Sequence, residues 1–315
     1  MGKTDIRIVG IGGGTGLSNL LGGIKLYTSN ITAIVTVTDD GGSSGRLREY
    51  FNMPPPGDIR NCIVSLAKSD SLLSELFQYR FRGKSDLSGH PFGNLFIAAM
   101  TNITGSFSKG ILEASRILSI KGKVLPSTLE NVVLGARFDD DKKVLGQTTI
   151  TDYPGTIREV FLEPSNPPAY TGVLKACKEA DIIALGPGSL FSSIIPNLLV
   201  KNVAKTISKS KAKKIYICNI MTQPGETDNF TVKDHVYEIE RYLKCNIDYL
   251  IVNSGFIPKE TAIRYAEKNS YVVFDDTDKL PDRINIIREN VSLNDIFVRH
   301  DLEKTAKIIF DRVKI

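Results

Sequence analysis

Apolar runs alternate with segments of helical period along most of this chain. Short β-branched runs predict strands near residues 6–11, 31–37, 181–185, 214–218 and 249–252, and a late one near 271–274. The stretches between most of these runs have the spacing of helices, starting with residues 17–27. Parallel strands joined by crossover helices produce this alternation, so the sequence predicts an α/β fold with a mostly parallel sheet.

Two parts of the chain depart from the alternation. Helical periodicity over residues 61–79 and 91–120, with no strand between them, predicts a helical cap. From about residue 121 to 170, glycines and prolines interrupt short β-branched runs and leave no room for a long helix. We expect a small β-rich antiparallel insertion there, with a hairpin turn at residues 139–142, inside a single α/β domain that covers residues 1–315.

Composition narrows the class of protein. The 315 residues are 42% hydrophobic and 24% charged, which is typical of soluble globular chains. The four cysteines have no C-x-x-C spacing, which argues against a zinc site and a redox pair, and we expect no metal site of that kind. No apolar stretch approaches the roughly 18 residues that span a bilayer, so we expect a cytoplasmic protein without membrane insertion.

The net charge indicates less about ligands and partners than the composition does about the class of protein. The net charge of +5 favours phosphorylated ligands but does not by itself indicate nucleic-acid binding. The densest basic run, residues 209–214, has no aromatic residues between its lysines to stack on bases, and we interpret it as a solvated loop. We therefore expect no nucleic-acid partner.

The second predicted strand ends in two adjacent carboxylates followed by a loop of small residues. The strand run is followed by Asp39 and Asp40 and then by Gly41, Gly42, Ser43 and Ser44. A carboxylate at the tip of a second strand is where a doubly wound fold binds ribose hydroxyls. The pair could instead hold a magnesium ion that bridges to phosphates, one acid could be a general base, or one could cap a turn. The sequence leaves these roles open.

A glycine loop follows the first predicted strand. It consists of Gly12, Gly13, Gly14, Thr15 and Gly16, directly before a predicted helix. Free backbone N–H groups and the positive end of a helix attract an anion, and the missing Cβ atoms let a phosphate approach. The spacing is G-G-G-x-G and not G-x-G-x-x-G, so the dinucleotide fingerprint is weak. A tight strand-to-helix turn is the alternative, but it explains only one or two of the glycines.

A similar junction occurs in the second half of the chain. The strand near residue 183 ends in Gly186, Pro187, Gly188 and Ser189. Two anion-binding loops in one fold suit a diphosphate. Later strand exits add polar groups, among them Asn219, while Arg299 supplies a cation near the end of the chain that could equally form a surface ion pair.

Two further clusters place polar residues at helix starts. A stiff proline segment precedes Asp58, Arg60 and Asn61; arginine suits phosphate, whereas the acid or amide could simply cap the helix. His90 and Asn94 precede and begin the next helix. A single histidine is more often structural than catalytic, and this cluster alone favours the structural interpretation.

These motifs together resemble those of a known family. Gly-Gly-Gly-Thr-Gly, Thr-Asp-Asp-Gly-Gly-Ser-Ser-Gly, Gly-Asp-Ile-Arg-Asn, Gly-His-Pro-Phe-Gly-Asn, Gly-Pro-Gly-Ser and Asn-Ile-Met-Thr-Gln-Pro-Gly-Glu-Thr occur in order over almost the whole chain. The series is similar to that of CofD-like proteins, specifically the bacterial gluconeogenesis-factor (YvcK) branch. The resemblance implies a Rossmann-like, doubly wound core with helices on both faces. It also implies binding of UDP-sugars such as UDP-N-acetylglucosamine, and a role in cell shape and envelope metabolism during gluconeogenic growth.

Residue by residue, the resemblance places the nucleotide against residues 12–16 and 186–189. Asp39, Asp40, Asn94 and Asn219 would surround the sugar or diphosphate, and Arg299 would close the site. The other branch of the family, 2-phospho-L-lactate transferase, uses a guanosine-diphosphate-linked lactate and a deazaflavin acceptor. The last motif resembles the gluconeogenesis branch more closely, although the acidic pair that a transferase could use with a metal ion is present.

Three functions remain open on the sequence. We favour a regulatory protein that binds a nucleotide-sugar, because anion loops and hydroxyl acceptors occur without a complete nucleophile and base set, and the resemblance implies that the nucleotide is UDP. We therefore name no catalytic residue. The alternatives are a phospholactate-type transferase that uses Mg²⁺ at Asp39 and Asp40, and a nicotinamide-dependent oxidoreductase, which the glycine spacing disfavours. A homodimer is expected from base rates, with a regulatory protein partner of unknown identity.

Overall fold

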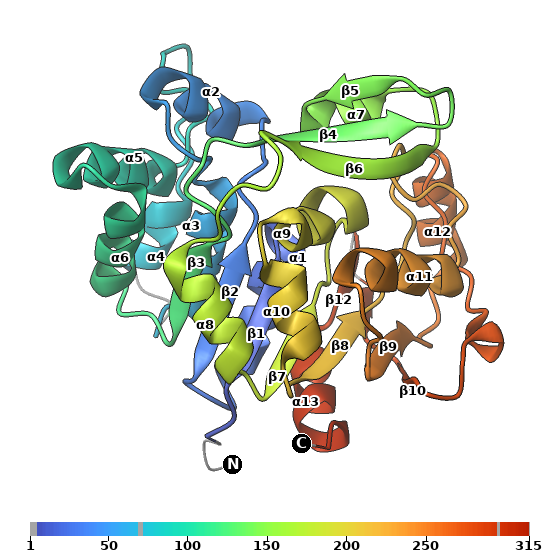
Figure 1. Cartoon of the computed structure of the whole chain (residues 1–315). Helices are drawn as coiled ribbons and strands as arrows, with labels where there is room; N and C mark the ends of the chain where they lie inside the picture. Colours follow the sequence, from blue (N-terminus) through green and yellow to red (C-terminus); the bar gives the residue numbers. More distant parts are fainter. Residues whose placement is uncertain (1–4, 69–71, 295–296, 315) are drawn as a thin grey trace.

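A seven-stranded parallel sheet forms the centre of the molecule (Figure 1). The computed structural model describes residues 5–68, 72–294 and 297–314. The strands of this sheet are β1 (Ile8–Gly12), β2 (Ile31–Val35), β3 (Lys123–Pro126), β7 (Ile182–Leu185), β8 (Lys213–Ile217), β9 (Tyr249–Asn253) and β10 (Asn285–Glu289). The prediction of an α/β fold with a mostly parallel sheet is confirmed.

The order of the strands creates a switch point beside β1. The sheet runs β10-β9-β8-β7-β1-β2-β3, so the chain moves outward from β1 to one edge and then returns to build the other half from β7. Ile11 on β1 pairs with Ile34 on one side and with Leu185 on the other. In open α/β sheets, ligands bind at the carboxyl ends of the strands where the order reverses. The loops after β1 and β7 are therefore at the expected place for a ligand.

Helices cover both faces of this sheet, as predicted. Every residue of β1 is buried, as are those of β7, because apolar helices pack on either side. The helices of the core are α1 (Gly14–Ile24), α8 (Thr171–Glu179), α9 (Ile195–Leu199), α10 (Val203–Lys209), α11 (Val232–Leu243), α12 (Lys259–Ala266) and α13 (Leu302–Arg312). In Figure 1, α8, α10 and α11 lie in front of the strands. Helix α13 packs against α1, where the rings of Tyr27 and Phe310 stack 4.7 Å apart.

The two long helical stretches predicted after β2 are each divided. The first stretch contains α3 (Gly57–Leu66) and α4 (Leu72–Gln78), and the second contains α5 (Phe92–Thr104) and α6 (Phe107–Ile117). Helix α2 (Gly42–Phe51) precedes both and begins in the segment predicted to be a loop of small residues. Helix α5 ends at Thr104, and the φ of 66° at the following Gly105 is the left-handed conformation that stops a helix and favours glycine. The chain reverses there, and α6 packs back against α5.

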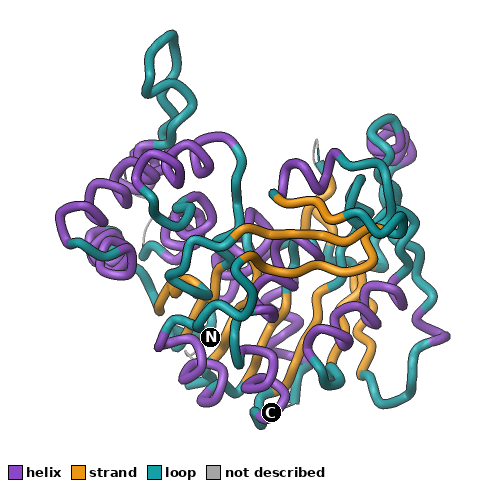
Figure 2. The backbone as a smooth tube through the Cα atoms, turned by 45° about the horizontal axis from the view of Figure 1, so that its top comes forward, coloured by secondary structure: helices purple, strands orange, loops and turns teal. Residues whose placement is uncertain are grey.

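The predicted β-rich insertion is present as a three-stranded antiparallel sheet. It contains β4 (Val133–Phe138), β5 (Lys143–Leu145), α7 (Gln147–Asp152) and β6 (Ile157–Glu163), in the order β5-β4-β6. Residues 139–142 form the turn between β4 and β5, as expected. Figure 2, which brings the top of Figure 1 forward, shows the insertion lying over the end of the main sheet. The preceding β3 instead joins the main sheet beside β2.

The prediction of a late strand near residues 271–274 is wrong. This segment makes only two isolated bridges, from Val272 and Phe274, and Phe274 is 65% exposed. Only Val273 of this run is buried in the core, and its three other side chains are exposed, so the run lacks the packing on both faces that stabilises a central strand. The sheet instead ends in β10, and a short hairpin of β11 (Ser292–Asn294) and β12 (Val298–His300) follows.

Candidate functional site

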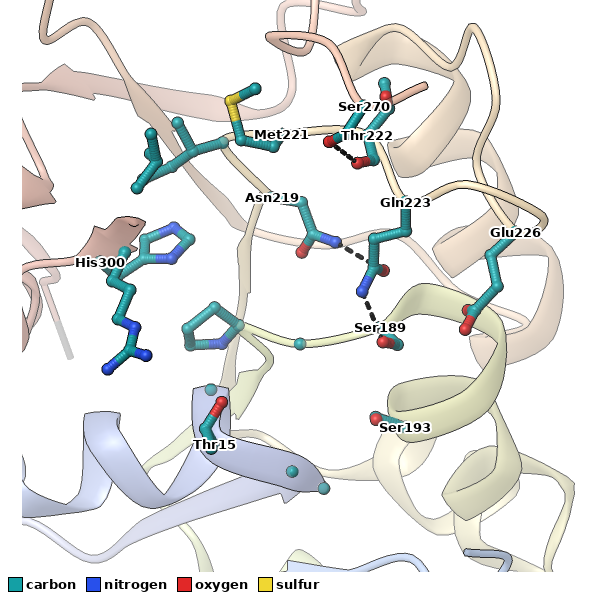
Figure 3. Close-up of a pocket in the computed structure, with 18 of the residues that line it drawn as sticks. Thr15, Ser189, Ser193, Asn219, Met221, Thr222, Gln223, Glu226, Ser270 and His300 are labelled. Carbon is teal, nitrogen blue, oxygen red and sulfur yellow. Dashed lines mark hydrogen bonds between the residues drawn. The ribbon is translucent and has the colours of Figure 1, made fainter. Parts of the chain in front are cut away.

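A cavity of about 700 Å³ lies at the carboxyl ends of the central strands. Its walls come from the loops after β1, β2, β7 and β8, together with α7, the end of α12 and the β12 strand. These segments are far apart in the sequence and meet only because parallel strands end at the same edge of the sheet. Figure 3 shows side chains from several of them around the opening.

The glycine loop forms the floor of this cavity. Gly13, Gly14, Thr15 and Gly16 line it, whereas Gly12 is the last residue of β1 and does not. Helix α1 begins at Gly14, so its first N–H groups lie in the cavity wall. The glycine at position 16 has a specific cause: a Cβ atom there would stand 2.2 Å from the carbonyl oxygen of Pro187. The missing side chain allows the first turn of α1 to touch the loop after β7.

Asp58 lies behind the glycine loop and also lines the cavity. Its carboxylate accepts a hydrogen bond from the backbone N–H of Gly14, and a Cβ atom on Gly13 would come within 2.7 Å of it. Desolvation, with a smaller effect of Asp39, raises the pKa of Asp58 to about 6. The carboxylate of Asp58 therefore occupies part of the positive N-terminal end of α1.

The two predicted carboxylates after β2 separate. Asp39 lines the cavity, and its Oδ1 accepts the N–H of Gly41 at 3.0 Å, which is a turn-capping contact. The Oδ1 of Asp40 accepts instead from the backbone N–H of Thr148 at 3.1 Å and from its hydroxyl at 2.8 Å. Asp40 thus joins the loop after β2 to the insertion. Asp39 and Asp58 line the cavity near the glycine loop, and a third acid, Glu226, lines it from the loop after β8.

Three other predicted residues meet away from the cavity. The Oγ of Ser43 lies 2.8 Å from Nδ1 of His90, and the Nδ2 of Asn94 donates to the same Oγ at 3.0 Å. All three are buried, and the pKa of His90 is lowered by desolvation and by the positive charges of Arg46 and Arg80. This cluster ties α2 to the start of α5. Its geometry is that of a structural contact, which agrees with the structural interpretation of His90.

The remaining residues of these motifs also lie outside the cavity lining. Arg60 donates from its guanidinium to Oδ1 of Asn61 at 2.7 Å, and desolvation lowers the pKa of Arg60 to about 10. Ser44 packs beside Gly57, where a Cβ atom would stand 2.4 Å from the Ser44 hydroxyl oxygen. Three glycines complete the set of predicted residues that do not line the cavity: Gly41, Gly42 and Gly186.

The loop after β7 faces the glycine loop, as expected for a second anion-binding segment. Pro187, Gly188 and Ser189 line the cavity. A chain of hydrogen bonds links this loop to the next one (Figure 3): Asn219 donates to Oε1 of Gln223 at 3.1 Å, and Gln223 donates to Oγ of Ser189 at 2.6 Å. The Oδ1 of Asn219 is buried without a hydrogen-bond partner in the described structure, which leaves an acceptor at the cavity wall.

The far end of the cavity carries an aromatic ring and two cations. Tyr265 and Lys268, at and just after the end of α12, line it together with the predicted Arg299. The hydroxyl of Tyr265 accepts the N–H of Val298 at 3.0 Å, and Nε2 of His300 donates to the carbonyl of Cys218 at 3.1 Å. Desolvation lowers the pKa of His300 to about 4, so the ring is neutral at pH 7. These contacts fasten β12 over the end of β8.

Sequence reasoning missed several lining residues. Among them are Gln147 and Thr151 on α7, and Tyr265 and Lys268 near α12. Gln147 follows a single glycine after the short strand β5, inside the segment interpreted only as a β-rich insertion, and Tyr265 and Lys268 lie within and just after a helix, so the sequence gives no strong local signal for them. Glu226 lies within a quoted motif, yet both of its carboxylate oxygens accept from Ser192, at 2.7 and 3.2 Å, and desolvation raises its pKa.

The described residues contain neither a membrane-spanning helix nor a cluster of metal-binding side chains. Over residues 5–68, 72–294 and 297–314, no helix is long and apolar enough to cross a membrane. Within the same described residues, no group of three or more histidine, cysteine, aspartate or glutamate side chains is arranged to hold a metal ion.

The fold and the cavity define a doubly wound α/β protein with a ligand cavity at its switch point. Comparison with known proteins gives the family. The model of the family described as 2-phospho-L-lactate transferase CofD matches residues 8–292, and the chain belongs to this family.

Relatives of similar length place the chain in the gluconeogenesis-factor branch. It is 46% identical over 312 residues to the gluconeogenesis factor of Bacillus subtilis, covering 98% of each chain. It is 42% identical to the gluconeogenesis factor of Listeria innocua, covering 96% of this chain and 94% of that protein. A crystal structure of a protein from Bacillus halodurans superposes with a TM-score of 0.94 at 42% identity, covering 98% of this chain and all of the other.

Proposed function

We propose that this chain binds a UDP-linked nucleotide-sugar, such as UDP-N-acetylglucosamine, and acts as a regulatory gluconeogenesis factor. The observation that carries the proposal is the layout of the cavity. Two small-residue loops, one at the start of α1 and one after β7, face each other in its middle. Backbone N–H groups and close backbone approach suit a diphosphate at this position.

The two ends of the cavity differ in chemistry, and this gives the ligand a direction. One end carries Tyr265, Lys268 and Arg299, where an aromatic ring and cations suit a nucleobase and its phosphate. The other end carries Asp39 and Asp58, whose carboxylates suit the hydroxyl donors of a sugar. The proposed ligand therefore spans the cavity from Tyr265 to Asp39 with its diphosphate on the glycine loop.

Three cavity residues of types common in catalysis, His300, Glu226 and Ser189, are held by structural contacts, which supports binding without turnover. His300 donates from Nε2 to the carbonyl of Cys218, and Glu226 accepts twice from Ser192. The hydroxyl of Ser189 is the acceptor of Gln223. A nucleophile needs an adjacent base that is free to take its proton, and these contacts leave none of the three groups in that arrangement.

The cellular part of the proposal rests on the relatives named gluconeogenesis factor. A cytoplasmic protein that senses a nucleotide-sugar of envelope synthesis would couple carbon supply to cell shape during gluconeogenic growth. It would act through a regulatory protein partner, with a homodimer as the expected oligomeric state. Ligand binding would favour one state of the protein over another for that partner.

A metal-dependent transferase is the second candidate, because two carboxylates face the same cavity. Magnesium is commonly held by one or two carboxylates together with phosphate oxygens and water, and Asp39 and Asp58 supply the two carboxylates. Desolvation is the main cause of the raised pKa of Asp58, and the negative charge of Asp39 adds a smaller effect that a bound cation would offset. Bound Mg²⁺ would neutralise charge on a transferred phosphoryl-type group. In this function Asp39 would keep its predicted metal role and Asp58 would take the place of Asp40.

One panel of measurements separates the candidates. We expect UDP and UDP-N-acetylglucosamine to raise the melting temperature and to give saturable heats in calorimetry, with GDP and NAD giving smaller effects. Mass spectrometry after incubation should return the nucleotide-sugar unchanged. No binding at millimolar UDP-sugar would refute the proposal. Product formed from a nucleotide-linked lactate and a deazaflavin in the presence of Mg²⁺ would establish the transferase instead.

Two variants test the placement of the ligand. Arg299→Ala removes the cation at the nucleoside end and should weaken UDP binding about 10-fold. Arg312→Ala serves as the matched control, because Arg312 forms a surface ion pair with Glu289 and does not line the cavity. An equal loss of UDP affinity in both variants would contradict the proposed direction of the ligand.

A further inference from the structure

The short helix α7 of the β-rich insertion closes one side of the cavity. It is the only part of the described insertion that lines the cavity, through Gln147 and Thr151. Figure 1 shows α7 beside β4 and β5 at the top of the molecule, above the carboxyl end of the main sheet. An insertion that covers a ligand cavity can add contacts that the core fold lacks.

Two contacts fix α7 to opposite walls of the cavity. At its start, Thr148 donates from its N–H and its hydroxyl to Oδ1 of Asp40, in the loop after β2. At its end, the carbonyl of Thr151 touches Gly225 so closely that a Cβ atom on this glycine would stand 2.1 Å from the oxygen. The helix thus bridges the loop after β2 and the loop after β8, and its position is set by both.

Gln147 has a free carboxamide on the cavity side of this bridge. Among the described residues its side-chain amide makes no hydrogen bond, although the residue is only partly exposed and lines the cavity. Gln223, the other glutamine in the lining, differs: its amide is used at both ends, by Asn219 and by Ser189. A ligand that offers a polar group to a partly buried amide without partners binds more tightly through the hydrogen bond that forms.

The position of α7 places Gln147 at the acidic end of the cavity. Thr148, the next residue, binds Asp40, and Asp39 lies directly before Asp40 in the same loop. The site of a Cβ atom on Gly41 is 3.4 Å from Oδ1 of Asp39 and 4.0 Å from Oγ1 of Thr148. The carboxamide offers both a donor and an acceptor next to a carboxylate that offers only acceptors.

We propose that Gln147 is a specificity-determining residue that hydrogen-bonds the sugar of the bound nucleotide-sugar, and that Asp40 positions it by anchoring α7. This inference rests on the proposed function and deepens it. The sugar end lies between Asp39 and α7, whereas the nucleoside end lies at Tyr265 and Arg299. The insertion therefore distinguishes the nucleotide-sugar from the free nucleotide, and it does so without contacting the base.

The test compares UDP with UDP-N-acetylglucosamine by calorimetry on the full chain. Gln147→Ala should lower the affinity for the nucleotide-sugar about 3- to 10-fold and leave the affinity for UDP within about twofold, as expected for one lost hydrogen bond. Thr149→Ala is the matched control on α7, because Thr149 is exposed and does not line the cavity. It should change neither affinity.

A third variant tests the anchoring role. Asp40→Ala should reproduce the selective loss, and adding Gln147→Ala to it should cost less than about twofold more, because the two residues act through the same contact. Full additivity would show that Asp40 contacts the ligand directly and would overturn the anchoring. Melting curves identify any variant that does not fold. In that case Thr148→Val, which removes the hydroxyl that donates to Asp40, replaces Asp40→Ala.

The outcomes separate this inference from the proposed function. A wild-type chain that binds neither ligand refutes both. A wild-type chain that binds both ligands, with Gln147→Ala unchanged or equally weakened for UDP and the nucleotide-sugar, refutes only the role of Gln147. Selective loss of the nucleotide-sugar in Gln147→Ala, with Thr149→Ala unchanged, supports it.

Discussion

The contact between the first turn of α1 and the loop after β7 makes Gly16 a sensitive position. A Cβ atom there would stand 2.2 Å from the carbonyl oxygen of Pro187 and 2.7 Å from its carbonyl carbon. Both are backbone atoms, so no side chain can rotate away, and α1 or the loop must move. We expect Gly16→Ala to lower the free energy of unfolding.

The magnitude follows from two opposing terms. Overpacking of a close contact costs about 3 kcal/mol at the upper end of its usual range, and the improved helix propensity of alanine returns about 1 kcal/mol. The net destabilisation of Gly16→Ala is therefore about 2 kcal/mol. Gly22 provides the matched control on the same helix, because a Cβ atom there meets nothing within 4 Å. Gly22→Ala should gain about 1 kcal/mol from propensity alone.

Urea unfolding followed by circular dichroism measures both variants. We expect Gly16→Ala to be less stable and Gly22→Ala more stable than the wild type, so that their free energies of unfolding differ by about 3 kcal/mol. The dependence of the free energy of unfolding on urea concentration should be similar in both variants. Gly16→Ala should also weaken nucleotide binding, because the displaced backbone carries both anion-binding loops. A Gly16→Ala chain as stable as Gly22→Ala would refute the reasoning.

Three further predictions follow from single contacts. The pKa of Asp58 is raised to about 6 in the folded protein. Between about pH 4 and 6 the folded protein therefore holds a proton on Asp58 that the unfolded chain has released. The contribution of Asp58 to stability falls as the pH rises through this window. After allowance for solvent screening, we expect the Asp58→Asn variant to be about 2 kcal/mol more stable than the wild type at pH 8 and little different at pH 4. Urea unfolding at the two pH values measures this, and a pH-independent difference would contradict it. Glu226→Ala leaves the N–H and hydroxyl of Ser192 without their acceptor and should lose about 1–3 kcal/mol, while Glu226→Gln, which keeps one acceptor oxygen, should lose less; thermal melts that rank them the other way would count against the contact. Gly225→Ala combines a φ of 75° with a clash against Thr151 and should lower both the melting temperature and the affinity for nucleotide-sugar, whereas an unaffected affinity would show that α7 tolerates displacement.

The correct and incorrect predictions about the fold share a physical cause. The strands at the centre of the sheet are buried on both faces, so their sequences are unbroken apolar runs that stand out against the surrounding helices. Strands at the edge have no such run: β3 contains Pro126, and β10 has only two adjacent isoleucines between polar residues. The run near residue 272 had the right residue types, but only Val273 packs into the core and its neighbours are exposed.

The features of the candidate site also fall into those that the sequence predicted and those that it did not. The chemistry of the loops after β1 and β7 is local, because small residues and free N–H groups at a strand exit attract anions wherever the chain places them. The sequence by itself thus determined the fold class, the family and the loops that line the middle of the cavity. Contacts between distant segments are set by how the sheet brings them together, and no local pattern encodes them.

Only the tertiary structure decided the partners of the acidic residues. It placed Asp58 at the start of α1, 44 positions away along the chain from Gly14, and it turned Asp40 toward Thr148, 108 positions away. Adjacent residues such as Asp39 and Asp40 share a sequence motif yet point to different neighbours, because side-chain direction depends on the packing around each one. The sequence identified the acids at the strand end, and the packing of the insertion and of α3 assigned one to the anchoring of α7 and the other to the cavity.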